Sequence, residues 1–156
     1  MKALAARLIR LFEQFPYALL ALLGRLAIGL VFFNSGQTKL QGTPICLGGH
    51  FCFKPNPFNL APSTFTLFEN DYALPFLPPW IAAHSAAMAE FSLSILLFAG
   101  LATRFSALGL LGMTLVIEIF VYPYAYVVHG TWATIFLMLI KFGPGKISLD
   151  QILARR

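Results

Sequence analysis

Four long apolar segments, interrupted by few charges, constrain this chain more than any other feature of its sequence. They cover residues 17–40, 80–100, 104–123 and 127–142. A helix needs about 20 mostly apolar residues to cross a bilayer. Only 11% of the 156 residues are charged, against about 25% in a typical soluble domain. The sequence therefore predicts one all-α domain over residues 1–156, a bundle of four transmembrane helices in contact with lipid.

The positions of the cations indicate how such a bundle would be oriented. Seven of them flank helix ends that would share one side of the membrane: Lys2, Arg7, Arg10, Arg104, Lys146, Arg155 and Arg156. The other side would hold only Lys39 and Lys54. Because Lys and Arg are enriched at cytoplasmic helix ends, we expect both termini in the cytoplasm and the protein in the inner (plasma) membrane of a bacterium. The basic residues form no continuous stripe, which argues against nucleic acid as a partner despite the net charge of +5.

Two segments outside the apolar runs have their own character. Residues 1–15 carry a stripe of large apolar side chains, which predicts either an amphipathic helix on the membrane surface or a frayed start of the first span. Residues 41–79 are rich in aromatic residues and hold most of the ten prolines. Since proline interrupts helices and sheets, we predict a long external loop here that caps the bundle and meets a periplasmic protein partner.

Cys46 and Cys52 lie in this predicted loop, on either side of His50. Gly48 and Gly49 would allow a tight turn between them, and an exported segment meets an oxidising environment. A structural disulfide is therefore the favoured interpretation. A metal site formed by the two cysteines with His50, a redox-active pair, and free thiols are the alternatives.

Charged residues inside the apolar segments form a candidate intramembrane polar cluster: Arg25, Lys39, Glu90 and Glu118. Charges in a bilayer are costly and normally face the interior of a bundle. Gly29 and Gly36 share a helix face with Arg25 and Lys39, and small residues flank Glu90 on its own helix face. We therefore expect close packing of these two helices, with Glu90 near mid-membrane reaching Arg25 or Lys39. Its role stays open between an ion pair that fixes the bundle and a proton-carrying or quinone-contacting carboxylate.

Histidine and methionine offer another interpretation. His84 and Met88 are four residues apart on one helix face, and with Glu118 and His129 they could bind a soft metal such as copper. Alternatively, both histidines are interfacial residues beside aromatic rings. The sequence contains no glycine-rich phosphate loop, nucleophile elbow or paired metal-thiolate motif. No catalytic residue is predicted.

The segment RLAIGLVFFNSGQTKL, residues 25–40, resembles the first-helix pattern of the DoxX family, with Arg, Gly, Phe, Gly and Lys at fixed steps. Glu90 followed by AGLATR at residues 99–104 is similar to that family's second helix and turn, and GPGKISLD at residues 143–150 is similar to its ending. The resemblance implies a four-helix inner-membrane protein linked to quinone-dependent or thiol-stress redox complexes. Some members of that family are encoded beside copper-responsive systems, so the resemblance also implies a link to copper as an alternative.

Three functions remain open at this point. The first is an accessory membrane subunit of a redox-linked complex, with quinone contacted near Glu90 and Arg25, rather than a stand-alone enzyme. The second is a copper- or other metal-handling membrane protein. The third is a non-catalytic membrane scaffold whose buried charges only specify helix pairing. The sequence leaves homo-oligomer formation open as well.

Overall fold

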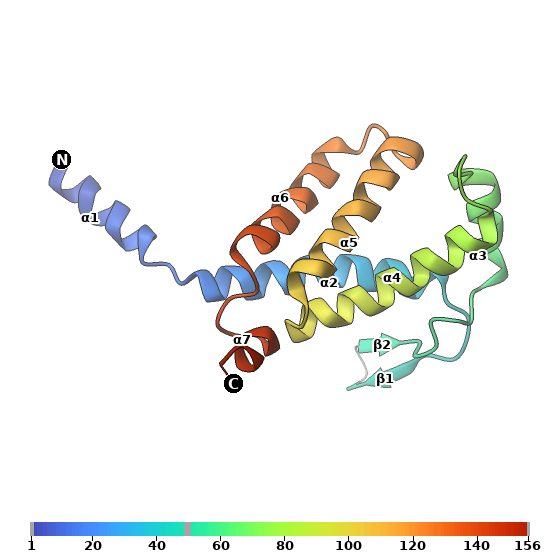
Figure 1. The fold of residues 1–156 in the computed structure, drawn as a ribbon, viewed down its shortest axis with the longest axis horizontal. Helices are drawn as coiled ribbons and strands as arrows, with labels where there is room; N and C mark the ends of the chain where they lie inside the picture. The colour runs from blue at the N-terminus through green and yellow to red at the C-terminus, as the bar shows by residue number, and fades with distance from the viewer. Residues whose placement is uncertain (1, 49–50, 156) are drawn as a thin grey trace.

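The computed structural model describes residues 2–48 and 51–155 (Figure 1). Its long helices are α1 (Lys2–Glu13), α2 (Tyr17–Lys39), α4 (Pro79–Ala99), α5 (Thr103–Val116), which continues as the π-helical turn η2 (Ile117–Val121), and α6 (Tyr126–Phe142). Its shorter elements are the strands β1 (Ile45–Leu47) and β2 (Phe51–Phe53), helix α3 (Pro62–Leu67), the π-helical turn η1 (Phe68–Tyr72) and helix α7 (Leu149–Leu153).

The predicted all-α bundle is confirmed. Helices α2, α4 and α5 with η2 are long and apolar enough to cross a membrane, and α6 is a shorter apolar helix. Helix α2 packs on α4 and α6, and α5 packs between α4 and α6. Each of the four begins and ends within two residues of the range expected from the sequence.

Proline and glycine set the ends of the second helix. Helix α4 begins at Pro79, where a missing N–H costs nothing because the first turn has no intrahelical acceptor for it. It ends at Gly100, whose φ of +66° is the left-handed conformation that glycine adopts without a steric penalty. A Cβ at Gly100 would also lie 1.9 Å from Nη1 of Arg25. The tight α4–α5 turn therefore requires glycine for two independent reasons.

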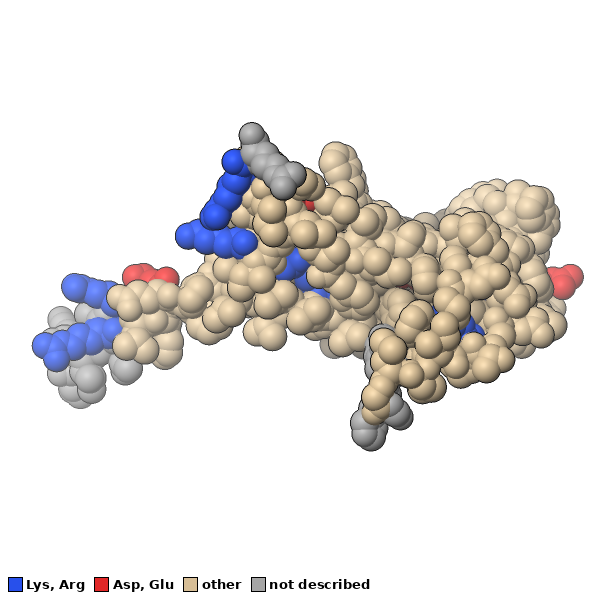
Figure 2. Space-filling view, turned by 90° about the horizontal axis from the view of Figure 1, so that it is seen from below, with Lys and Arg blue, Asp and Glu red and all other residues tan. Residues whose placement is uncertain are grey.

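The bundle interior is apolar and closely packed. Its main cluster of buried residues comprises Ala21, Ile28, Phe32, Leu97, Ala107, Leu110, Phe136 and Leu139. The ring of Phe32 lies 5.4 Å from that of Trp132 and 5.6 Å from that of Phe136, centroid to centroid. Large apolar side chains also point outward, as at Leu23, Phe105 and Leu108. On the face that Figure 2 shows, uncharged residues cover most of the middle of the molecule, and only small areas of charged residues are visible between them.

The segment between α2 and α4 is more ordered than the predicted loop. Its second half, α3 and η1, packs on the N-terminal half of α4, where Leu60 and Phe68 are buried against Ala83 and Ala87. Its first half forms a β-hairpin of β1 and β2, where an irregular loop was predicted. Gly48, with a φ of +61°, lies at its turn. We call residues 41–78 the cap.

The N-terminal helix α1 extends away from the bundle, beyond the start of α2 (Figure 1). The chain breaks its helical course around Pro16 before α2 begins. The apolar side chains of Ile9, Leu11, Phe12 and Phe15 are more than half exposed on this segment. Such a helix suits a membrane surface, and that placement stays a prediction.

Candidate functional site

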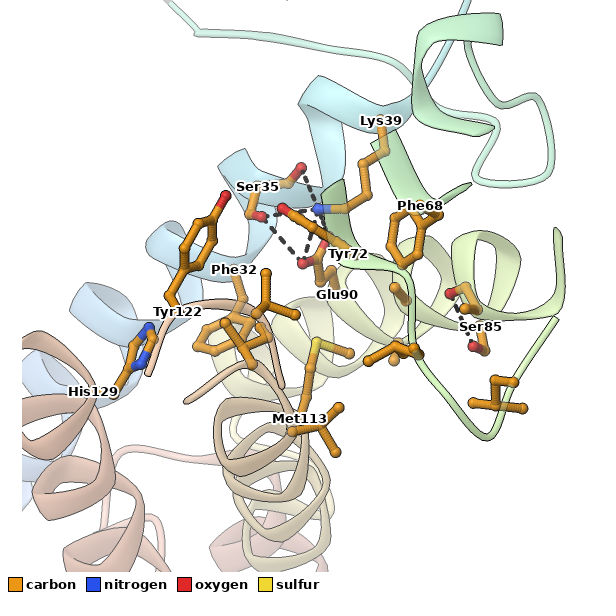
Figure 3. Close-up of a pocket in the computed structure, with 18 of the residues that line it drawn as sticks. Phe32, Ser35, Lys39, Phe68, Tyr72, Ser85, Glu90, Met113, Tyr122 and His129 are labelled. Atoms are coloured by element: carbon orange, nitrogen blue, oxygen red, sulfur yellow. Dashed lines mark hydrogen bonds and ion pairs between the residues drawn. The ribbon is translucent and has the colours of Figure 1, made fainter. Parts of the chain in front are cut away.

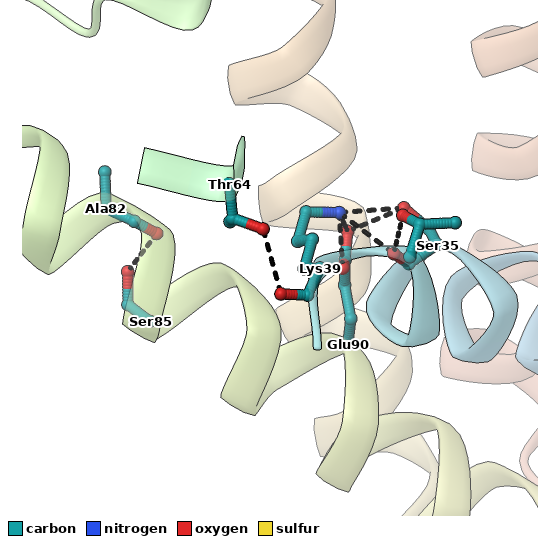
Figure 4. A network of polar contacts seen from close by, with 7 residues as sticks. Ser35, Lys39, Thr64, Ala82, Ser85 and Glu90 are labelled. Carbon is teal, nitrogen blue, oxygen red and sulfur yellow. Dashed lines mark hydrogen bonds and ion pairs between the residues drawn. The ribbon is translucent and has the colours of Figure 1, made fainter. Parts of the chain in front are cut away.

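A buried ion pair joins the end of α2 to the middle of α4 (Figure 4). Nζ of Lys39 lies 2.7 Å from Oε2 and 3.0 Å from Oε1 of Glu90. The two side chains are 5% and 3% exposed. The hydroxyl of Ser35 donates to Oε1 of Glu90 over 3.0 Å and accepts from Nζ of Lys39 over the same distance. Each charge therefore has an opposite charge and a hydroxyl as partners, which is what a buried ion needs.

The local sequence explains how these groups meet. Ser35 and Lys39 are one helical turn apart and share a face of α2. Gly36 lets α4 approach closely, because a Cβ there would lie only 3.2 Å from Cβ of Glu90. The backbone carbonyl of Lys39, at the end of α2, accepts hydrogen bonds from the hydroxyl of Thr64 and the N–H of Ala61. The cap thus provides hydrogen-bond donors for the last carbonyl of α2, next to the ion pair.

Arg25 does not join this cluster. Its Nη1 donates to the carbonyl of Leu97 over 3.3 Å, and its Nη2 donates to the carbonyl of Ile147. Of the two partners expected for Glu90, the structure selects Lys39. Glu90 lies level with the last turn of α2, because a Cβ at Gly36 would lie 3.2 Å from its Cβ. The expected position of Glu90 near mid-membrane stays a prediction.

A cavity of about 450 Å³ lies beside the ion pair, bounded by α2, η1, α4, α5 with η2, and α6 (Figure 3). Its wall is mostly apolar and includes Phe32, Phe68 and Met113. Lys39 and Glu90 form part of its wall. The cavity therefore combines apolar walls with a few charged groups, the usual composition of a small-molecule site.

A second polar pair lies on another wall of the cavity. Nδ1 of His129 is 2.5 Å from Oε2 of Glu118, and the His129 ring lies 5.0 Å from that of Trp132. His129 itself lines the cavity and is 7% exposed. Glu118 and His129 are 11 residues apart, and the α5–α6 connection makes their helices antiparallel neighbours. That short connection was the sequence signal that could have predicted this pair.

Two tyrosines add hydroxyl groups to the cavity wall. Tyr72, at the end of η1, and Tyr122, just after η2, have ring centroids 6.0 Å apart in an edge-to-face arrangement. Burial in the cap, together with a hydrogen bond with Tyr122, raises the pKa of Tyr72 above its ordinary value of 10.0. Tyr72 therefore remains a neutral donor at physiological pH.

Comparison with protein families decides the membership of this chain. The model of the DoxX family matches residues 20–123. The chain belongs to the DoxX family. The matched region contains Lys39, Glu90 and Glu118 but ends before His129. Comparison with curated proteins and with solved structures gave no match.

Family membership and the apolar helices together make this DoxX protein a multi-pass integral membrane protein. Its exposed apolar helix faces are therefore in contact with lipid. The cavity, in turn, lies among helices that cross or enter the membrane.

The candidate copper ligands of this DoxX protein are engaged separately. Nδ1 of His84 lies 2.8 Å from the carbonyl oxygen of Trp80, and its ring is 5.5 Å from that of Phe65. His129 is paired with Glu118 instead. In the described ranges, no group of three His, Cys, Asp or Glu residues is placed to hold a metal ion. Met88 therefore has no such group of ligands beside it among the described residues. His50 lies outside the described residues.

The two cysteines face each other across the hairpin. Cys46 on β1 is the register partner of Cys52 on β2, and a disulfide joins them. On β1, the flanking side chains of Ile45 and Leu47 are 49% and 60% exposed. The hairpin thus presents an apolar edge whose two strands are covalently linked.

Proposed function

We propose that this DoxX protein is an accessory membrane subunit of a redox-linked complex, and that its cavity binds the ring of a quinone. One observation carries the proposal: a largely apolar cavity of about 450 Å³ among membrane helices has the Lys39–Glu90 pair and His129 in its wall. Its volume lies within the range of about 300–1,000 Å³ that is usual for small-molecule sites.

The chemistry of the wall suits a quinone. Quinone oxygens accept hydrogen bonds, and the cavity offers donors in the tyrosine hydroxyls and, when a proton of the ring faces the cavity, in His129. The Lys39 ammonium, whose hydrogens are engaged by Glu90 and Ser35, adds a positive charge to the wall. The aromatic walls suit a flat ring. Reduction of a quinone takes up protons, and Glu90 and His129 are both ionisable groups with a second ionisable partner. The bilayer would hold the isoprenoid tail.

Bound quinone can be measured directly. The protein would be extracted from its native membrane in a mild detergent, and the quinone would be quantified after organic extraction. We expect an amount comparable to that of the protein. In the double variant Lys39→Met/Glu90→Gln we expect about tenfold less, because two charged hydrogen-bonding groups are lost.

The exposed carboxylate Glu69 in the cap offers a matched control. Glu69→Gln makes the same chemical change as Glu90→Gln, away from the ion pair, and should leave the quinone content unchanged. A wild-type protein that carries no quinone in its native membrane would overturn the proposal. So would equal loss in the double variant and in Glu69→Gln.

The proposal includes an orientation in which both termini are cytoplasmic and the cap lies outside a bacterial inner membrane. The distribution of cations supports it. At the cap end, Lys39 is paired with Glu90, and Nζ of Lys54 donates to the carbonyls of Gln37 and Leu40 at the end of α2. Lys39 thus contacts α4 and Lys54 contacts the end of α2, so both cations are engaged within the protein. A reporter fused after Pro57 should be active only outside the cytoplasm.

We further propose that the hairpin binds a protein partner and that its disulfide forms in the cell. The exposed apolar edge at Ile45 and Leu47 supports the first statement, and the cross-strand position of Cys46 and Cys52 supports the second. Thiol labelling of intact cells should modify neither cysteine before reduction. A photo-crosslinking residue at position 47 should capture a protein, whereas the same residue at the outward-facing position 108 of α5 should capture lipid.

A further inference from the structure

A second cavity lies at the opposite end of the bundle from the cap, where α2 and α5 begin and α6 ends. Its volume is about 800 Å³, and Tyr17, Thr103 and Gly143 are part of its wall. The hydroxyl of Tyr17 donates to the carbonyl of Gly143 over 2.6 Å, which joins the start of α2 to the end of α6. Because these are the ends of membrane helices, the cavity lies at the level of the lipid headgroups whichever side of the membrane this end faces.

Two cations of this cavity are unpaired. Arg104 and Lys146 line it and are exposed. In the part of the chain that the structure describes, the ion pairs are Lys39–Glu90 and Glu118–His129, so neither cation has a carboxylate partner there. The carboxylate of Asp150 also lines the cavity, but its two oxygens accept from the backbone N–H groups of Ala102 and Thr103.

The surroundings of the cavity are strongly basic. Figure 2 shows Lys and Arg gathered at this end of the molecule. Seven of the cations whose side chains are described belong to it, against the carboxylates of Glu13 and Asp150: Arg7, Arg10, Arg25, Arg104, Lys141, Lys146 and Arg155. An anion approaching this end is therefore attracted from a distance.

We propose that this cavity binds an anionic phospholipid, with its phosphate held by Arg104 and Lys146. The apolar part of the wall favours a lipid over free phosphate. Phe105, which is 78% exposed, and Phe142, which is 59% exposed, border the cavity. They provide a surface for the glycerol backbone and the first part of an acyl chain. Basic pockets between membrane helices bind anionic headgroups in this way.

The binding can be measured on the full-length protein in detergent by native mass spectrometry. The probes are phosphatidylglycerol and phosphatidylcholine, added separately at increasing concentration. We expect one phosphatidylglycerol to bind much more tightly than phosphatidylcholine. In Arg104→Gln/Lys146→Gln this affinity should fall about 30-fold, because each cation near an anionic lipid contributes a factor of about five.

The matched control is Arg7→Gln/Arg10→Gln, which removes the same charge from α1 at the same end of the molecule. Because the described side chains of α1 do not line the cavity and its exposed charges are screened, this variant should change the affinity by about threefold or less. Thermal unfolding without added lipid checks that all variants remain folded. Equal losses in the two double variants would overturn the proposal, since binding would then reflect net charge alone. Inorganic phosphate will also be added as a competitor. If it displaces bound phosphatidylglycerol as effectively as further phosphatidylglycerol does, the ligand is free phosphate and the assignment to a lipid is refuted.

Discussion

The Lys39–Glu90 pair leads to a quantitative prediction about stability. Its two side chains are 5% and 3% exposed, so a charge that loses its partner stays largely shielded from bulk water. Removal of one partner from a buried ion pair typically costs about 3–5 kcal/mol. We expect Lys39→Met, which replaces the ammonium with an apolar chain of similar length, to lower the free energy of unfolding by about 3 kcal/mol. The low end of the range applies because Ser35 still donates to Glu90.

The double variant Lys39→Met/Glu90→Gln tests the physical origin of this cost. With both charges removed, no uncompensated ion remains in the interior. The free energy of unfolding should therefore return to within about 1 kcal/mol of the wild-type value. The two single changes must then be strongly non-additive, with a coupling energy of about 2–3 kcal/mol or more between residues in direct contact.

Unfolding would be followed in mild detergent by titration with a denaturing detergent, with far-ultraviolet circular dichroism and tryptophan fluorescence as probes. Trp132 is packed against Phe32 in the core and reports on loss of tertiary packing. Glu69→Gln, on the exposed surface of the cap, should change stability by less than about 0.5 kcal/mol. Additive effects of the two single changes would refute the reasoning, because they would show that the charges do not depend on each other.

Three further predictions concern the turns and the cap. Gly100→Ala should lower the thermal unfolding temperature clearly, by more than the effect of about 1 kcal/mol expected from its φ of +66° alone, because the new Cβ would also meet Arg25 at 1.9 Å. Asp150→Asn should cost about 1 kcal/mol of unfolding free energy, since its carboxylate caps two backbone N–H groups at the start of α5. Because burial and the hydrogen bond with Tyr122 raise the pKa of Tyr72 above 10.0 in the folded state, the contribution of Tyr72 to stability should be constant below pH 10 and be lost as the pH rises above it. Tyr72→Phe should make that fall shallower in chemical denaturation measured between pH 8 and 11.

The helices could be predicted because their signal is local. Runs of about 20 apolar residues are visible in the sequence without any knowledge of contacts. The glycines of α2 also identified the face that meets α4, and Gly36 does lie against Glu90. Helical periodicity gives the face of a contact, but it does not give the offset of two helices along their axes. That offset decides between Arg25 and Lys39 as the partner of Glu90, and it depends on how far α4 extends into the cap.

The partners of Arg25 and the structure of the cap were beyond such reasoning. Arg25 donates to backbone carbonyls of Leu97 and Ile147, and a carbonyl group gives no signal in a sequence. The hairpin is only three residues long on each strand, and the prolines around it argued for an irregular segment. The π-helical turns η1 and η2 border the cavity, and they depend on packing rather than on a local pattern. The candidate site is thus formed largely by features that only the folded chain reveals.

The energetics of the Lys39–Glu90 pair bear on whether it serves the fold or a ligand. Replacement of a buried ion pair by uncharged groups of similar volume is often neutral or stabilising, so stability alone does not require these charges. They also line a cavity, where a packed apolar pair would be cheaper to bury. If Lys39→Met/Glu90→Gln is as stable as the wild type but loses its quinone, the charges serve the ligand. If the variant keeps both its stability and its quinone, the pair only sets the register of α2 against α4, as the scaffold hypothesis holds.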